Sequence, residues 1–92
     1  MSEASTVEAE FTVRGELGLH ARPAGRFAAL AGKYSSEISV GRGEEWVNGC
    51  SVLSILSLAA GPGTALRIRA IGSDAADAVR ELGALLESTE HP

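Results

Sequence analysis

Cysteine and long apolar runs are nearly absent from this chain. Of its 92 residues only Cys50 is a cysteine, so no disulfide can form within the chain, which fits a reducing compartment. No segment approaches the roughly 20 apolar residues that a membrane-spanning helix needs. The first eleven residues carry three glutamates and no apolar stretch of signal-peptide length. We therefore expect a soluble, cytoplasmic protein that does not insert into a membrane.

Positive charge is also sparse. The eight Lys and Arg residues are scattered and are outnumbered by twelve Asp and Glu, which leaves a net charge of −4. This argues against nucleic acid as a partner, because nucleic-acid binding relies on clustered cations that neutralise phosphates. No glycine-rich loop leads into Lys and Ser or Thr, as nucleotide binding would require. His20, His91 and Cys50 do not have the spacing of a zinc site. No metal or cofactor is expected.

The length of the chain predicts one domain. We expect this domain over residues 7–88, between a disordered tail over 1–6 and a frayed tail over 89–92. A domain of this size buries only about 60–65% of the surface of its unfolded chain, so it has little room for a deep active site. We therefore expect the protein to act at its surface, through partner proteins. A monomer is expected.

The hydrophobic pattern predicts four strands and three helices. Apolar and polar residues alternate in some segments, and apolar residues recur at helical spacing in others. The fold class is therefore α+β, an open-faced β-sandwich with a four-stranded, mainly antiparallel sheet covered on one side by the three helices. In chain order the elements are a strand over 7–13, a helix from Pro23 to near Gly32 or Tyr34, strands over 38–40 and 46–47, a helix over 52–58, a strand over 66–71 and a helix over 75–86.

Turn and cap residues separate these elements. Arg42, Gly43 and Glu44 are predicted to form a turn between the two short strands. Ser51 stands where the N-cap of the second helix belongs, and Ser73 or Asp74 is predicted to cap the third.

His20 is the residue best placed to carry chemistry. It precedes a helix whose N-terminus is assigned to Ala21 and Pro23, and Arg22 follows it by two residues. A helix N-terminus presents unpaired N–H groups and about half a positive charge, so an anion on His20 would meet backbone donors there. Arg22 adds a cation that can neutralise phosphate oxygens. From these residues alone, a capping or surface role for His20 is an equally good interpretation.

The second helix is apolar nearly all round. A helix on the outside of such a fold buries only one side, so one apolar face should stay near the surface and serve as a docking patch. The alternative is a tilt of the helix that buries both faces. The two faces carry Val52, Ile55 and Ala59, and Leu53, Leu56 and Ala60.

A resemblance to a known family covers almost the whole chain. The run from Gly18 to Ala24, Gly-Leu-His-Ala-Arg-Pro-Ala, resembles the phosphohistidine signature of HPr, the histidine-containing phosphocarrier family of the bacterial phosphotransferase system. The order of strands and helices is also similar. Asn48–Leu53, Gly61–Gly63 and Gly72–Asp74 stand where that family has a helix start and two turns.

The resemblance implies a role for each candidate residue. His20 would take a phosphoryl group from phosphoenolpyruvate-charged Enzyme I and pass it to an EIIA-type acceptor, with Arg22 as the phosphate partner. The chain would be a substrate of its partners and not an enzyme. The family's docking surface combines the start of the first helix with the second helix, here Val52, Leu53 and Leu56.

Two further expectations stay open at this point. The family's regulatory serine corresponds to Ser51, whose phosphorylation would require an HPr kinase/phosphorylase, but many relatives under this control carry a basic residue where this chain has Cys50. Other functions compatible with the sequence are a regulatory, nitrogen-type phosphorelay carrier without sugar transport, and a non-phosphorylated protein-binding module of the same fold.

Overall fold

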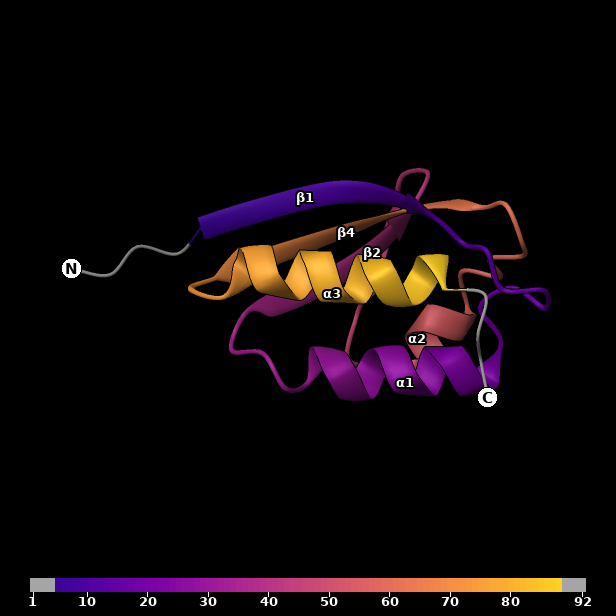
Figure 1. Ribbon diagram of the computed structural model, residues 1–92, viewed down its shortest axis with the longest axis horizontal. Coiled ribbons are helices and arrows are strands. Elements are labelled where there is room, and N and C mark those ends of the chain that lie inside the picture. The colour runs from indigo at the N-terminus through magenta and orange to yellow at the C-terminus, as the bar shows by residue number, and fades with distance from the viewer. Residues whose placement is uncertain (1–4, 89–92) are drawn as a thin grey trace.

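Four antiparallel strands form one sheet in the spatial order β1-β4-β2-β3. Figure 1 labels the first three of these strands, which lie in that order. The computed structural model describes residues 5–88, so the expectations for residues 1–4 and 89–92, His91 among them, lie outside the described residues. The predicted order βαββαβα and the open-faced, antiparallel fold are confirmed. The elements are β1 Ser5–Thr12, α1 Ala21–Ala31, β2 Glu37–Arg42, β3 Glu45–Asn48, α2 Val52–Leu56, β4 Ala65–Gly72 and α3 Ala75–Glu87.

The strand register builds the core in rows across the sheet. Side chains alternate between the two faces of a strand, so residues that pair directly share a face. Ala9 pairs with Ile68, which pairs with Val40, which pairs with Val47. Ile68 and Val40 are fully buried in this row. The alternation seen in the sequence therefore marks the face that the helices cover.

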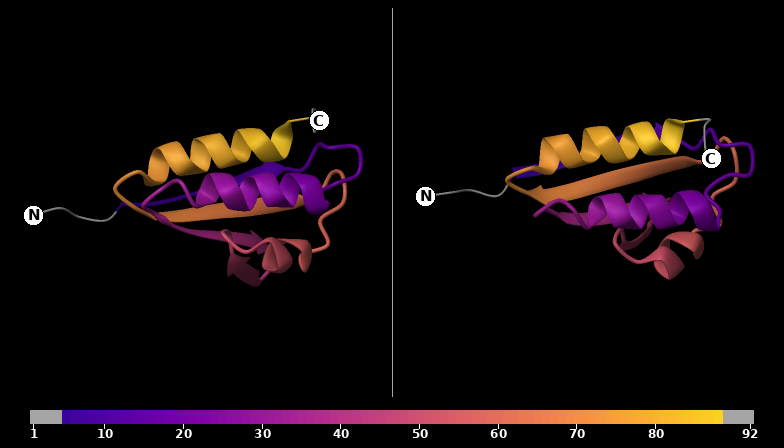
Figure 2. Two further views of the ribbon diagram at one scale, coloured as in Figure 1. Left: turned by 90° about the horizontal axis from the view of Figure 1, so that it is seen from below. Right: turned by 60° about the horizontal axis from the view of Figure 1, so that its bottom comes forward.

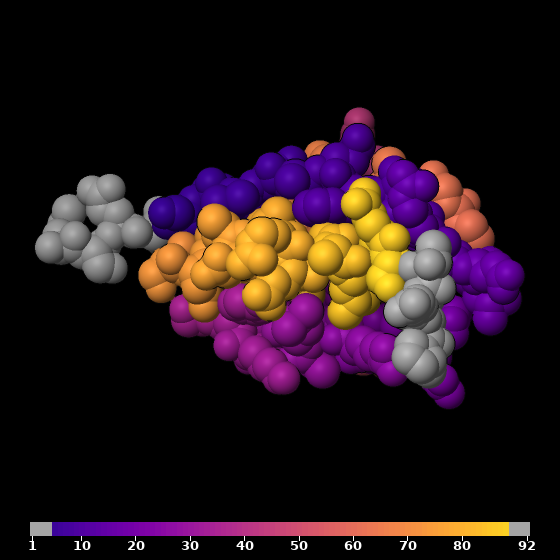
Figure 3. All heavy atoms as spheres, viewed as in Figure 1, coloured from indigo at the N-terminus to yellow at the C-terminus, as the bar shows by residue number. Residues whose placement is uncertain are grey.

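The helices lie on that one face. Figure 2 shows α1 and α3 side by side over the sheet, and α2 packs against α1 and β3. In the space-filling view α3 fills the space between β1 and α1 (Figure 3). The centre of this layer is Phe27 of α1, Ile55 of α2 and Leu82 of α3, each at most 1% exposed.

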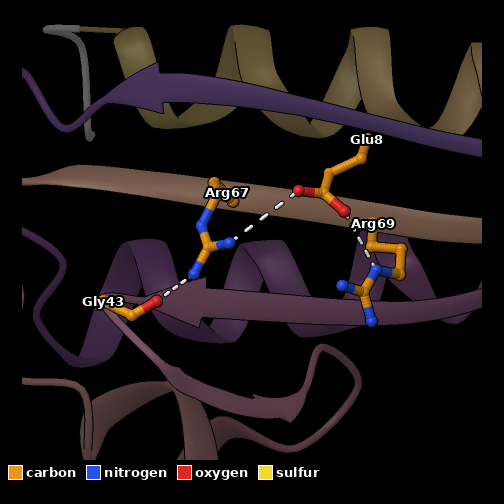
Figure 4. Close-up of polar contacts among 4 residues, drawn as sticks. All are labelled: Glu8, Gly43, Arg67 and Arg69. Atoms are coloured by element: carbon orange, nitrogen blue, oxygen red, sulfur yellow. Dashed lines mark hydrogen bonds and ion pairs between the residues drawn. The ribbon is translucent and has the colours of Figure 1, made fainter.

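The uncovered face of the sheet is polar. Glu8 on β1 pairs with Arg69 at 3.1 Å and with Arg67 at 3.9 Å (Figure 4). Arg67 also donates to the carbonyl of Gly43. Both guanidinium groups lie over the ring of Trp46, with 4.6 Å from Arg67 and 4.0 Å from Arg69 to the ring centroid. Glu8, Arg67 and Arg69 therefore interact with one another and with Trp46 on this face.

The ends of two strands differ from the prediction. Ser5 and Thr6, assigned to a disordered tail, pair with Gly72 and Ile71 as the first residues of β1. A strand ladder is made by backbone groups, so polar side chains that give no alternating pattern can still extend it. Arg42 was assigned to the turn but is the last residue of β2, where it pairs with Glu45.

The second helix is shorter than predicted. The apolar run continues to Leu58, but α2 ends at Leu56 and Ser57 is its C-cap. The Ser57 hydroxyl donates to the Ser54 carbonyl at 2.6 Å, and Ala59 then adopts a left-handed backbone with φ +52°. None of the helices described over residues 5–88 is long and apolar enough to cross a membrane.

Candidate functional site

His20 is the N-cap residue of α1. Its backbone is extended, with φ −83° and ψ −169°, and its carbonyl accepts the first hydrogen bond of the helix, from the Ala24 N–H at 3.0 Å. The imidazole does not cap the helix, since no side-chain cap hydrogen bond is made. The residue is partly exposed. Its ring is therefore placed at the helix entrance without serving as the cap.

The loop before His20 is anchored on the loop that follows α2. The Leu19 N–H donates to the Ala60 carbonyl at 2.8 Å, and the Leu19 side chain is 6% exposed. Gly18 has φ +71°, and a Cβ there would lie 2.6 Å from the Ala60 oxygen and 2.7 Å from Gly61 Cα. Only glycine allows both this backbone and this approach. Gly18 thus allows the loop before α1 to lie against the loop that follows α2.

The first turn of α1 presents donors and one cation toward solvent. The helix hydrogen bonds begin with Ala24 and Pro23 has no N–H, so the N–H groups of Ala21 and Arg22 precede the intrahelical ladder. Pro23 is buried, whereas Ala21 and Arg22 are exposed, and the first turn holds no acidic residue. The sequence placed Ala21 and Pro23 at the N-terminus of this helix, and the structure agrees. An anion on His20 would meet a positive field with no competing carboxylate from that turn.

Ser51 is the N-cap of α2. Its hydroxyl accepts from the Ser54 N–H at 3.2 Å, and the residue is partly exposed. Cys50 beside it is exposed, and its N–H donates to Asn48 Oδ1 at 2.8 Å. The capping role predicted for Ser51 is confirmed.

Neither predicted face of α2 stays exposed as a whole. In one face Ile55 is 1% exposed, and in the other Ala60 is 5% exposed. Leu53 is 80% exposed, whereas Val52 and Leu56 are partly buried against the core. The expectation that one complete face would be exposed was wrong, because the helix ends early and the chain after it bends. Leu53 is the one fully exposed member of the three docking candidates.

A second exposed apolar side chain was not singled out from the sequence. Leu17 is 75% exposed and lies three residues before His20, in the loop that Gly18 anchors. Its signal in the sequence is an apolar residue in a glycine-bounded loop, where solvent-facing side chains are usually polar. Leu17 and Leu53 are thus both exposed apolar side chains, one in the loop before α1 and one in α2.

The groups around His20 are suited to holding an anion. Over residues 5–88 there is no group of three His, Cys, Asp or Glu that could hold a metal ion. Backbone N–H groups, the helix dipole and Arg22 can neutralise phosphate oxygens around His20. Together these groups create a positive field at the start of α1.

Comparison with known proteins bears on the same residues. A family model described as the PTS HPr component phosphorylation site matches residues 7–88. The chain is 42% identical over 77 residues to the phosphocarrier protein HPr of Pseudomonas putida, covering 79% of this chain and 86% of that protein. It is 35% identical over 82 residues to the phosphocarrier protein NPr of Shewanella violacea, covering 89% and 90%.

A solved structure shares the fold. The crystal structure of the phosphocarrier protein HPr from Bacillus anthracis str. Ames superposes with a TM-score of 0.86 at 34% identity, covering 89% of this chain and 98% of that one.

Proposed function

The chain belongs to the HPr family of phosphocarrier proteins, which are not themselves enzymes, and we propose that it carries its phosphoryl group on a ring nitrogen of His20. The observation that supports this most is the placement of His20. Its imidazole stands at the entrance of α1 without capping it, two residues from an exposed arginine and next to N–H groups outside the helix ladder.

The transfer itself is a substitution at phosphorus. A ring nitrogen of neutral His20 attacks the phosphorus of the charged donor, and the N–P bond forms as the bond from phosphorus to the donor breaks. The donor keeps the electron pair of that bond. In the second step an acceptor side chain attacks the same phosphorus, and His20 leaves with the electron pair of the N–P bond. No oxidation or reduction occurs in either step.

Arg22 and the helix entrance stabilise the carried group. The Ala21 and Arg22 N–H groups and the Arg22 guanidinium interact with phosphoryl oxygens, whose charge spreads in the transition state. The guanidinium is exposed, so a partner protein can reach the phosphorus from the solvent side. Each partner supplies the remaining charge neutralisation.

The partners are phosphotransferase-system proteins. Enzyme I, charged by phosphoenolpyruvate, is the donor in this proposal and an EIIA-type protein is the acceptor. The docking surface combines the first turn of α1 with Leu53 and with the edges of Val52 and Leu56. In this proposal the protein acts in the cytoplasm, as a monomer.

A labelling experiment tests the proposal. Incubation with labelled phosphoenolpyruvate and Enzyme I should give an acid-labile, alkali-stable label on the wild-type protein and none on His20→Ala. Circular dichroism of the variant serves as the control for folding. Absence of label on the wild type, while a known HPr is labelled in the same reaction, would contradict the carrier function and favour a protein-binding module.

The nitrogen-type branch is a second candidate. Similarity to an NPr over 89% of this chain supports it beside the similarity to HPr proteins. Transfer from the labelled protein to sugar-type and nitrogen-type EIIA acceptors, measured side by side, distinguishes the two. The branch is the one whose acceptor is charged faster at equal concentration.

Ser51 is proposed as a site of regulatory phosphorylation by an HPr kinase/phosphorylase. Its partial exposure and its place beside Leu53 support this, because a phosphate adds nearly two negative charges next to the docking surface. ATP-dependent, acid-stable label that is lost in Ser51→Ala would be the expected result. A kinase that labels a Gram-positive HPr but not this chain would contradict it, and Cys50→Lys would then show whether the missing basic residue is the reason.

A further inference from the structure

Arg42 reaches from the sheet to the second helix region. It is the last residue of β2 and shares the inner face of that strand with Ile38 and Val40, at alternating positions. Its Nη1 donates to the carbonyls of Leu58 at 2.8 Å and Ala59 at 2.9 Å. One exposed cation on the sheet therefore holds two consecutive carbonyls directly after α2.

The segment that Arg42 holds has an unusual backbone. Ala59 is the one non-glycine residue of the described chain with a positive φ, +52°. Alanine adopts this left-handed conformation at a cost, so the surrounding contacts must maintain it. Its N–H donates to the Leu56 carbonyl at 3.0 Å, and its carbonyl accepts from Arg42. Without the guanidinium, one of these two contacts is lost.

The next residue is bonded to the loop that carries His20. The Ala60 carbonyl accepts from Leu19, the residue directly before His20, at 2.8 Å. Gly18 lies against the same carbonyl. A continuous series of contacts therefore leads from Arg42 through Ala59 and Ala60 to the loop that ends at His20.

We propose that Arg42 is a positioning residue for phosphoryl transfer. It holds residues 58–60 so that His20 and the exposed Leu53 keep one fixed relative position, and one partner can engage both. This inference rests on the proposed function. It adds a residue that lies outside the signature and contacts neither His20 nor the carried group directly.

Hydrogen exchange tests the positioning without any partner. In Arg42→Met, which keeps the aliphatic stem and removes the donors, exchange of the Leu19 N–H should rise about tenfold or more. Exchange of the Ile68 N–H in the central strand β4 should stay within about twofold. Arg80→Met, which removes an exposed arginine from α3, is the matched control and should change neither. Arg42→Lys, which keeps a cationic donor, should restore part of the protection.

Transfer kinetics test the consequence. The rate of phosphoryl transfer from Enzyme I and to an EIIA acceptor should both fall about fivefold to tenfold in Arg42→Met at saturating partner, and Arg42→Lys should recover part of each rate. Unchanged Leu19 exchange, an equal rise at Leu19 and Ile68, or wild-type transfer rates would each overturn the proposal. If the wild-type protein takes no label at all, the proposed function has failed instead, and Leu19 exchange still decides whether Arg42 holds the loop.

Discussion

The chemical role proposed for His20 depends on the residues around it. Its place at the start of α1, two residues before Arg22, is what makes it the candidate for carrying an anion. Gly18 contributes by allowing the close contact with Ala60. The sequence alone located these residues, because helix starts and glycine turns are local features.

The prediction at the residue scale concerns Arg22 and the rate of phosphoryl transfer. Arg22→Ala should slow transfer about tenfold or more, since a charge-assisted hydrogen bond to the phosphoryl group is lost. The midpoint of thermal unfolding should stay near the wild-type value, because substitutions of exposed side chains usually change stability by less than about 0.5 kcal/mol. Arg80→Ala is the matched control on α3. A wild-type transfer rate, or unfolding at ambient temperature seen by circular dichroism, would refute the assignment.

The second helix shows how an element can be predicted correctly in type and wrongly in detail. Its N-cap Ser51 follows from the sequence, since capping depends on a residue three positions away. Its length does not, because α2 ends where Ser57 bonds to Ser54 and where Arg42, distant in sequence, holds the next carbonyls. Within the helix, Leu53 is 80% exposed and Ile55 is 1% exposed, a difference that depends on how the helix packs against α1 and β3.

Two substitutions in this helix should therefore behave differently. Leu53→Ser should raise the KM of Enzyme I for this protein as its substrate. The free energy of unfolding should stay within about 0.5 kcal/mol of wild type. Ile55→Ala should destabilise the fold by about 2–5 kcal/mol in urea unfolding, because it opens a cavity in the core. Ile71→Ser, at a partly exposed apolar residue on the uncovered sheet face, controls for loss of surface hydrophobicity. An equal KM change in Leu53→Ser and Ile71→Ser would argue against docking through α2.

At the scale of the whole molecule, side-chain contacts join the segment after α1 to α3. The Asp74 carboxylate, at the start of α3, accepts from the N–H and hydroxyl groups of Ser35 and Ser36 in the loop after α1. Nearby, the Tyr34 hydroxyl donates to Glu81 of α3, and this hydrogen bond raises the pKa of Tyr34 to about 12. Asp74 is the N-cap residue of α3, one of the two candidates from the sequence, but its side chain makes no capping hydrogen bond to its own helix.

These contacts predict a specific acid sensitivity. Hydrogen bonds from the Ser36 hydroxyl and then the Ser35 N–H lower the pKa of Asp74 below its usual value. A carboxyl group with a lowered pKa in the folded state stabilises the fold above its unfolded pKa of about 4, and that contribution is lost as the pH falls through the folded pKa.

Asp74→Asn should therefore lower the unfolding midpoint at pH 7 and make it vary less between pH 5 and pH 2. Urea unfolding at a series of pH values measures this. Glu16→Gln, which changes an exposed carboxylate in the loop before α1, should leave the wild-type pH dependence in place. A parallel pH dependence in Asp74→Asn and the wild type would rule out this role for the carboxylate.

The sequence by itself determined the strand and helix order, the covered face of the sheet and the place of His20, Arg22 and Ser51, because alternation, helical spacing and capping act over a few residues. Only the tertiary structure decided that β1 begins at Ser5, that Arg42 bonds to the end of α2 and that Asp74 joins two distant segments. The exposure of Leu17 and Leu53 was decided there too. Each of these features depends on contacts between residues far apart in the sequence, and a local sequence pattern does not indicate such contacts.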